Sequence, residues 1–412
     1  MLYVGLNELI RFVRTTGERS FMWVGPRPYV FITDDEMIKT VMNNYIVFQK
    51  PFKASNPIVK RQIGGLVRFE GEKWSKTRKK LRPHFHLEKL KNMVSTMQKY
   101  AEQFLDEFSR SPKGWVVDSV GCLPYLPDYT ATVVSNILFG IPFDNSVKRT
   151  FGLIRELTFI ANQAQPFNIR GEQYVPTRRY RRANAIENEL TAIFTNMMNE
   201  RLKKWERGEV KGEPNLYDIF LDELNETDIK DKNARAMAMF DIIQQSKLFF
   251  LAGHETTSNL IAWTIVMLSI HHKWQSLARE EAFQVIGDNE KLTDDDLDRL
   301  KIIHMILHEL LGIYLHRDPK IWGDDVLEFK PDRFAEGVLK AANGHAAFIP
   351  FGWGVRKCIG ANMALREAKV FLSLFLRRFT FDLSPTYMHG PLVSLNMQPQ
   401  YGIPLILSKL QV

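Results

Sequence analysis

The sequence predicts a mainly α-helical protein with a minor β portion. The chain has 412 residues, of which 45% are hydrophobic and 25% charged, and this composition is typical of a globular protein. Several long stretches carry apolar residues at three- and four-residue intervals, the spacing of amphipathic helices: 89–108, 186–205, 236–270 and 273–286. No internal repeat or Gly/Ser linker interrupts them. We therefore expect a single large domain over residues 1–412.

The β portion is expected near the start of the chain. Two short apolar runs, 21–24 and 29–32, flank the segment Gly25-Pro26-Arg27-Pro28. Glycine and proline between β-prone runs predict a β-hairpin. Asp34 and Asp35 then favour the start of a helix.

Two more helices are expected in the C-terminal part. Thr293 followed by Asp296 matches a capping box, which predicts a helix that continues through Glu309. A second helix is predicted over 361–379, where apolar residues recur at core spacing.

Charge and cysteine content exclude several classes of protein. Lys and Arg number 55 against 47 Asp and Glu, a net charge of +8, which suits an acidic partner without identifying one. The two cysteines, Cys122 and Cys358, lie far apart in the sequence, which argues against a disulfide scaffold or a C-x-x-C pair. We find no apolar run long enough for a membrane span and no signal-peptide pattern at the N-terminus, so we expect neither an anchor nor secretion.

The most informative segment is the cysteine loop, residues 351–360, with the sequence FGWGVRKCIG. Its three glycines permit a tight turn and the close approach of a flat molecule. Cys358 precedes a helix N-terminus and neighbours Arg356 and Lys357, and all three features favour a thiolate, which serves as a nucleophile or as a metal ligand. A small buried hydrophobic role fits Cys122 better than Cys358.

The pattern Phe351-x-x-Gly354-x-Arg356-x-Cys358-x-Gly360 resembles the haem-binding loop of the cytochrome P450 superfamily, and all five fixed positions match. The resemblance implies the cytochrome P450 fold, a helical domain around a buried haem b. It also implies that Cys358 is the iron ligand, that Arg356 binds a haem propionate, and that Phe351 and Gly360 belong to the cofactor site.

The segment Leu251-Ala252-Gly253-His254-Glu255-Thr256-Thr257 resembles the family's oxygen-binding helix. The resemblance implies that Ala252 and Gly253 leave room for dioxygen and that Glu255 and Thr256 relay protons. Hydroxyls that bond to their own helix are the alternative. We expect His254 to face away from the iron.

A second cofactor contact is expected in the helix that contains Trp74 and Arg78. Their i, i+4 spacing lets the indole N–H and the guanidinium reach one carboxylate, and the pair resembles the family's propionate-binding W-x-x-x-R motif. Six basic residues lie between Lys73 and Arg82, either as a solvated face or as a docking surface for an acidic flavoprotein electron donor. The basic run 178–182 is expected to start a surface helix, and we expect no nucleic-acid partner.

Other segments extend the resemblance over nearly the whole chain. The stretches 316–319, 322–323 and 329–334 resemble the family's approach to the cysteine loop. The stretches 85–90, 175–179 and 398–402 resemble plant members that oxidise terpenoids or hormones. Substrate contacts are expected near 58–69, 249–251 and 391–395, where the residues indicate only an apolar pocket.

The sequence departs from the family after Glu309. The family's Glu-x-x-Arg motif has Gly312 at its last position here, and only three residues separate Gly312 from His316. We therefore expect a β-rich segment to be missing, the small sheet to be incomplete, and Glu309 and Arg333 to lose a shared partner, at a cost of about 3–5 kcal/mol for a buried unpaired charge. The family's N-terminal anchor is also expected to be missing.

The leading hypothesis is a haem-thiolate monooxygenase that inserts one oxygen atom of O2 into a small hydrophobic substrate, with electrons from NADPH through NADPH-cytochrome P450 reductase. By resemblance it would act at the cytosolic face of the endoplasmic reticulum membrane. The alternative is a catalytically impaired, truncated product with at most partial haem binding. A cysteine-nucleophile hydrolase would need a histidine partner, for which the candidates are His304, His308, His316 and His345.

Overall fold

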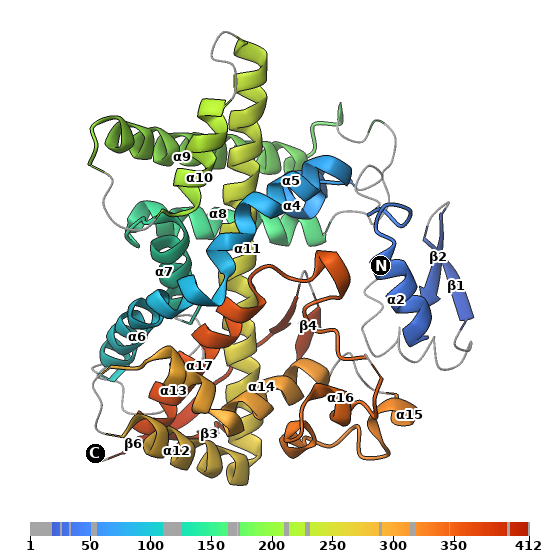
Figure 1. Cartoon of the computed structure of the whole chain (residues 1–412), viewed down its shortest axis with the longest axis vertical. Helices are drawn as coiled ribbons and strands as arrows, with labels where there is room; N and C mark the ends of the chain where they lie inside the picture. Colours follow the sequence, from blue (N-terminus) through green and yellow to red (C-terminus); the bar gives the residue numbers. More distant parts are fainter. Residues whose placement is uncertain are drawn as a thin grey trace. The chain divides into compact units, whose positions relative to one another are not determined.

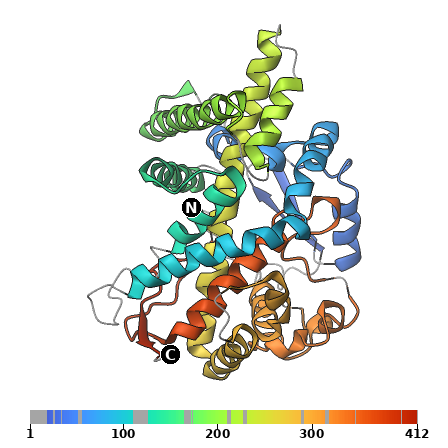
Figure 2. The ribbon, with the colours of Figure 1, turned by 60° about the vertical axis from the view of Figure 1, so that its left-hand side comes forward.

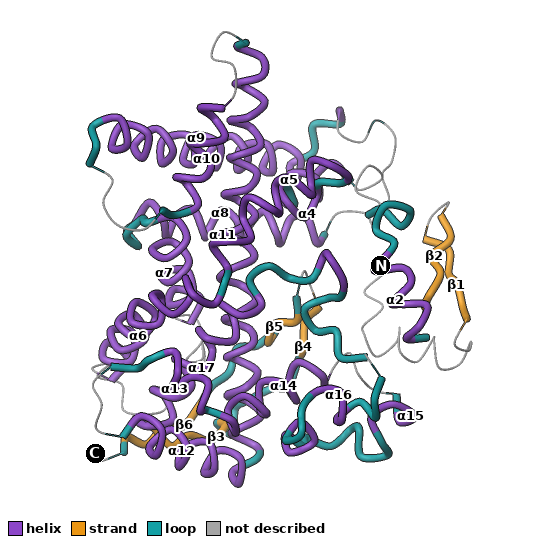
Figure 3. The backbone as a smooth tube through the Cα atoms, viewed as in Figure 1, coloured by secondary structure: helices purple, strands orange, loops and turns teal. Residues whose placement is uncertain are grey.

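The computed structural model describes residues 19–24, 27–32, 34–50, 56–109, 126–163, 171, 174–209, 214–226, 231–287, 291–313, 318–345, 347–393 and 396–410. These residues form two compact units, one drawn from 1–33, 44–84 and 134–253 and the other from 34–43, 85–133 and 254–412. Helices dominate both units and strands are short (Figure 3). The prediction of a mainly helical protein with a minor β portion is confirmed.

The first unit contains the predicted hairpin, formed by β1 (Arg19–Val24) and β2 (Arg27–Ile32), whose antiparallel register pairs Phe21 with Val30. Phe250 is at the centre of its aromatic core, with ring centroids 4.7 Å from Phe139, 5.0 Å from Phe151 and 5.1 Å from Phe194. The helices of this unit are α3 (Pro57–Gln62), α4 (Gly65–Arg68), α5 (Gly71–Leu81), α8 (Asn145–Asn162), α9 (Arg178–Glu206) and α10 (Leu216–Glu226), with parts of α7 (Leu126–Phe139) and α11 (Lys232–Ile270). The short 3-10 helix η2 (Arg82–Phe85) follows α5.

The second unit contains most of the remaining helices. They are α2 (Asp35–Asn43), α6 (Leu87–Ser109), α12 (His272–Ile286), α13 (Asp294–Arg299), α14 (Lys301–Ile313), α15 (Pro319–Trp322), η4 (Pro331–Phe334), α16 (Val338–Ala341), η5 (Gly354–Arg356) and α17 (Ala361–Arg378). Two antiparallel strand pairs accompany them: β3 (Phe379–Leu383) with β6 (Leu405–Lys409), and β4 (Pro391–Val393) with β5 (Met397–Pro399).

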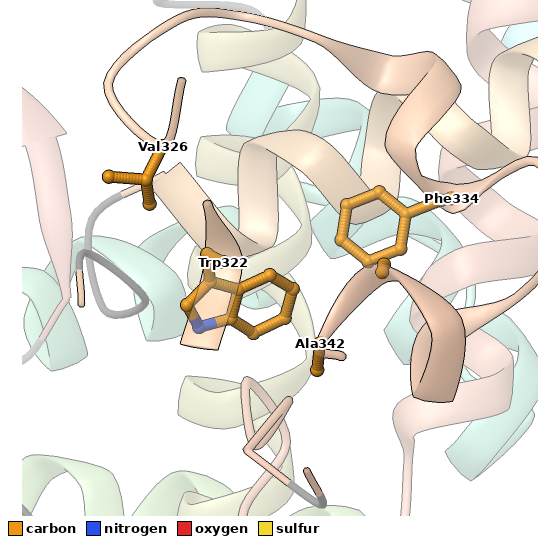
Figure 4. Packing of buried hydrophobic residues seen from close by; sticks show 5 residues of the cluster. Trp322, Val326, Phe334 and Ala342 are labelled. Atoms are coloured by element: carbon orange, nitrogen blue, oxygen red, sulfur yellow. The ribbon is translucent and has the colours of Figure 1, made fainter. Parts of the chain in front are cut away.

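Two apolar clusters hold the second unit together. Helix α6, cyan, lies along α17, red (Figures 1 and 2), and the Phe371 ring centroid is 5.7 Å from Phe104 and 5.0 Å from Tyr129. The second cluster lies between α15 and α16, where Trp322 and Phe334 face one another (Figure 4). It packs the segment that leads into the cysteine loop.

The helix expected from Thr293 through Glu309 is divided into two. Its start is confirmed, because Thr293 and Asp296 form the reciprocal capping box. However, α13 ends at Arg299, and Leu300 has a non-helical ψ of 78°. The carboxylate of Glu281 on α12 accepts the N–H groups of Ile302 at 2.6 Å and Ile303 at 3.0 Å. A side chain remote in sequence thus caps a new helix, which local spacing does not reveal.

Helix α11 is the longest element, with 39 residues, about 58 Å at the usual rise. It begins in the first unit and continues into the second from His254. None of the described helices combines the length and apolar character required to cross a membrane.

Candidate functional site

The cysteine loop turns tightly before α17. The Cys358 N–H donates to the Phe351 carbonyl at 2.8 Å, and Gly352 and Gly354 have positive φ values of 74° and 65°, a region that favours glycine. A Cβ on Gly354 would also lie 2.8 Å from the Asn43 side-chain oxygen at the end of α2. The two glycines are therefore required by the backbone turn itself.

Cys358 is exposed and lies three residues before α17 begins at Ala361. Half-buried Arg356 and exposed Lys357 stand next to it in the chain. The helix N-terminus and the two cations favour the thiolate. A buried hydrophobic role is excluded for this cysteine by its exposure. Cys122, predicted to be a core residue, lies outside the described residues.

Phe351 and Gly360 end the loop on either side and are half-buried. Gly360 has an ordinary φ of −92°, and a Cβ there would lie 4.0 Å from the Phe85 ring, an ordinary contact. This part of the protein therefore has room for a methyl group at position 360. The cofactor roles of Phe351, Arg356 and Gly360 stay predictions.

The predicted oxygen-binding segment lies within α11, where Ala252 and Thr256 are exposed in an otherwise largely buried stretch. Residues four apart share a helix face, so one narrow face presents a methyl group and a hydroxyl. His254 is 2% exposed and thus lies off that face, whereas its orientation away from the iron stays a prediction. Its carbonyl accepts a hydrogen bond from the Thr130 hydroxyl at 2.9 Å.

Gly253 has a packing role that the sequence does not reveal. A Cβ at this position would lie 2.6 Å from Cγ2 of Val134 on α7, much closer than real side chains approach. The glycine therefore allows α7 and α11 to touch. Its contribution to space for dioxygen stays a prediction.

Glu255 is 8% exposed, and its Oε1 accepts a hydrogen bond from Nε2 of Gln398 at 2.6 Å. Gln398 lies on β5, 143 residues further along the chain. In the sequence, Gln398 belongs to the stretch 398–402, which resembles plant members of the family. No role at the site was predicted for it.

Trp74 and Arg78 lie on α5 in the first unit, one turn apart as expected. The indole is 5% exposed, its ring centroid is 5.0 Å from that of Tyr45, and the Arg78 guanidinium lies 5.8 Å from the indole centroid. The shared face is confirmed, whereas binding of a propionate stays a prediction.

Glu309 and Arg333 form an ion pair, contrary to one expectation from the sequence. The Arg333 Nε donates directly to Glu309 Oε2 at 2.9 Å, and its guanidinium also reaches Asp325 Oδ1 at 3.1 Å. The Lys330 backbone N–H donates to Glu309 Oε1 at 3.0 Å. The shared arginine is absent, because Gly312 takes its place. The prediction that a buried charge is left unpaired is wrong, because Glu309 and Arg333 pair with each other and with nearby groups. Burial raises the pKa of Glu309 to about 7.

Three of the candidate histidines for a hydrolase are described by the structure, and each has contacts with other groups. On α14, the tilted rings of His304 and His308 are in contact, with centroids 4.0 Å apart, and burial lowers the pKa of His304 to about 3. His345 Nδ1 lies 3.2 Å from the Asp35 carboxylate. His316 lies outside the described residues. Nothing in this arrangement supports a Cys358–His catalytic pair.

The sequence profile of the cytochrome P450 family matches residues 6–314 and again residues 312–402. The chain belongs to the cytochrome P450 family. It is a monooxygenase of that family, and haem b is its cofactor. The residues of this P450 fit such a group, because Cys358 is exposed on a turn that requires its glycines and α11 exposes the small side chains of Ala252 and Thr256 one turn apart.

Similar proteins place this P450 among plant enzymes. It is 39% identical to a 7-deoxyloganic acid hydroxylase of Catharanthus roseus, over 98% of this chain and 84% of the relative. It is 36% identical to an echinocystic acid 23-monooxygenase of Saponaria officinalis, over 95% and 81%. A cytochrome P450 crystal structure superposes with a TM-score of 0.79 at 20% identity, covering 99% of this chain and 98% of that one, which supports the fold.

Proposed function

We propose that this chain is a haem-thiolate hydroxylase in which Cys358 is the iron ligand. The exposure of Cys358 at the N-terminus of α17 carries this proposal. When bound, haem supplies the activation of O2, from which one oxygen atom is inserted into a hydrophobic substrate and the other leaves as water. The Cys358 thiolate would hold the group and donate electron density to it.

The other predicted site residues bind the cofactor or move protons. Arg356, Trp74 and Arg78 hold the propionates through charge-assisted hydrogen bonds, and Phe351 and Gly360 shape the loop. Ala252 and Gly253 keep the α11 backbone accessible. Glu255 and Thr256 deliver protons from a carboxylate and a hydroxyl on adjacent residues.

The reduced carbon-monoxide difference spectrum of the purified chain tests iron ligation. We expect a thiolate-type band in the natural protein and its loss in Cys358→Ser. Cys122→Ser is the matched control and should keep the band. A natural protein that binds haem without this band would refute the proposal.

The substrate class we propose is a terpenoid that bears a carboxylic acid. Two relatives support it by their names, which specify 7-deoxyloganic acid and echinocystic acid. Titration of the oxidised holoenzyme with each acid and its methyl ester, followed by the haem absorption spectrum, tests the class. We expect an acid to bind at least about tenfold more tightly than its ester, because the ester lacks the charge. Equal affinities would contradict it.

NADPH-cytochrome P450 reductase is the proposed electron donor, at the cytosolic face of the endoplasmic reticulum membrane. Exposed basic residues on and after α5, including Lys79, Lys80 and Arg82, support docking of an acidic flavoprotein. We expect Lys79→Glu to raise the reductase concentration needed for half-maximal turnover and Lys340→Glu, on α16, to leave it unchanged. Equal responses of the two variants would argue against docking at α5.

We also propose that residues 1–412 form one P450 domain that lacks a family segment between Gly312 and His316. Two observations support this. The family profile matches in two stretches that meet at 312–314, and the alignment with the Catharanthus enzyme spans 441 positions, more than the 412 residues of this chain. The alternative of an impaired product is weakened by the direct pairing of Glu309 with Arg333. Comparison of the transcript with its genomic exons tests whether the segment is absent.

A further inference from the structure

The β4–β5 hairpin is attached to α11 at two points. Gln398 Nε2 donates to Glu255 Oε1 at 2.6 Å. One residue earlier on β5, the carbonyl of Met397 accepts a hydrogen bond from the Trp263 indole at 3.0 Å. Glu255 and Trp263 are eight residues apart, about 12 Å along the helix. The strand is therefore held against α11 over two turns.

The orientation of the Gln398 amide is determined by its two acceptors. Nε2 lies 2.6 Å from Glu255 Oε1 and 3.2 Å from Asn396 Oδ1. An amide nitrogen has two hydrogens and an amide oxygen has none, so only the nitrogen satisfies both contacts. Gln398 is thus a donor to Glu255, and it carries no charge that could itself titrate.

This donor acts on a carboxyl group that has little contact with solvent. Glu255 is 8% exposed, whereas its neighbour Thr256 lies on the exposed face of α11. A hydrogen bond to a carboxylate in such surroundings is stronger than one in water. It restricts the torsions of the Glu255 side chain and so determines where the second carboxylate oxygen points.

We propose that Gln398 is a positioning residue for Glu255. It holds the Glu255 carboxylate in one orientation on α11, so that protons are delivered from a fixed position. The inference rests on the proposed function, in which Glu255 delivers protons. It adds a residue from β5, next to the stretch expected to contact substrate, to the proton-delivery apparatus on α11.

The fate of dioxygen in the absence of substrate reports on this role. With electrons from NADPH through the reductase, O2 takes two electrons and two protons to give H2O2, or four electrons and four protons to give two molecules of water. Water formation needs twice as many protons, so poorer proton delivery shifts the outcome toward peroxide. The measured quantity is H2O2 formed per NADPH consumed, which requires no knowledge of the substrate.

The variants are Gln398→Leu, which removes the donor at similar volume, and Gln400→Leu as a matched control on an exposed residue just after β5. We expect Gln398→Leu to raise the peroxide yield about threefold, toward that of Glu255→Gln, and Gln400→Leu to match the natural protein. Gln398→Leu should add little in the Glu255→Gln background. A natural peroxide yield in Gln398→Leu would overturn the proposal.

A second measurement separates this inference from the proposed function. In thermal unfolding of the holoenzyme, Gln398→Leu should lower the midpoint by about 2 °C and by much less in the Glu255→Gln background. Additive shifts would show that the two side chains do not interact and would also overturn the proposal. The carbon-monoxide spectrum is recorded for every variant. A missing thiolate band in the natural protein refutes the proposed function, whereas a normal band with additive shifts refutes only the role of Gln398.

Discussion

At the scale of single residues, Arg333 determines how the region before the cysteine loop is held. Its guanidinium contacts Glu309 and Asp325 and donates to the carbonyls of Trp322, Asp325 and Glu328. One side chain thus connects α14 to the turn before η4. Removing it would leave the Glu309 carboxylate, only 4% exposed, without its counter-charge, the costly case for a buried ion pair.

The pKa of Glu309 gives a prediction about pH. Burial raises this pKa from 4.5 to about 7, against the lowering effect of Lys330 and Arg333. Between these values the folded protein binds the proton more tightly than the unfolded chain. The carboxyl's contribution to stability is therefore complete below pH 4.5 and is lost as the pH rises through 7, by roughly 3 kcal/mol in total.

Thermal unfolding between about pH 5 and pH 8 tests this prediction. The midpoint of Glu309→Gln should fall less with rising pH than that of the natural protein, because the amide does not titrate. Glu328→Gln, at an exposed position in the turn before η4, is the control. Its unfolding midpoint should change with pH as that of the natural protein does. Parallel curves for the natural protein and Glu309→Gln would show that this pKa is not raised.

Whether an interaction between residues could be predicted depends on how far apart its partners lie in the sequence. The Cys358 loop, the Thr293–Asp296 capping box and the shared face of Trp74 and Arg78 depend on residues within one or two turns, so the sequence predicts them. The Gln398–Glu255 bond joins residues 143 positions apart. Glu309 and Arg333 are separated by 24. Such partners depend on how elements pack, which periodicity alone does not specify.

At the scale of elements, the contact of α7 with α11 depends on Gly253. Gly253→Ala would place a Cβ 2.6 Å from Val134 Cγ2. Overpacking of this kind costs about 1–3 kcal/mol, more than the gain of about 1 kcal/mol in helix propensity. We expect Gly253→Ala to lower the unfolding midpoint of the purified chain. Val134→Ala in the same chain should restore part of the loss, and a more stable Gly253→Ala would contradict the contact.

The start of α14 depends on a side chain of α12. Glu281 accepts the N–H groups of half-buried Ile302 and buried Ile303, so Glu281→Ala leaves both donors without their acceptor. We expect a loss of about 2 kcal/mol in the free energy of unfolding, measured in denaturant. Glu280→Ala, at an exposed neighbouring position on the same helix, should change it by less than about 0.5 kcal/mol. Equal effects of the two variants would mean that Glu281 does not cap α14.

This capping explains why the expected helix from Thr293 through Glu309 is two helices. Leu300 is fully buried between them, and a strong acceptor on α12 makes a second helix start favourable. The apolar spacing of the segment is the same for one helix or two. The boundary is therefore decided by a tertiary contact rather than by helix propensity.

At the scale of the whole molecule, the described strands form three separate two-stranded sheets. This agrees with the expectation of an incomplete sheet. On β1 and β2, Phe21, Trp23 and Val30 are 57%, 62% and 69% exposed. Most apolar burial in the described parts is instead between helices, around Phe250 in one unit and around Phe371 and Trp322 in the other. We therefore expect the stability of the chain to depend on helix packing, and we expect its cofactor to add to it.

Removal of the cofactor tests this dependence. A ligand that binds only the folded state stabilises it by about 4 kcal/mol at a thousandfold excess over its dissociation constant. For a chain of this size we expect the haem-loaded protein to unfold roughly 5 °C above the haem-free protein. Re-addition of haemin should restore the midpoint in the natural protein and only partly in Cys358→Ser, which lacks the thiolate. Because the measurement requires neither substrate nor reductase, it tests haem binding separately from catalytic activity. Coincident unfolding curves with and without haem would show that haem does not stabilise the folded chain, whatever activity is found.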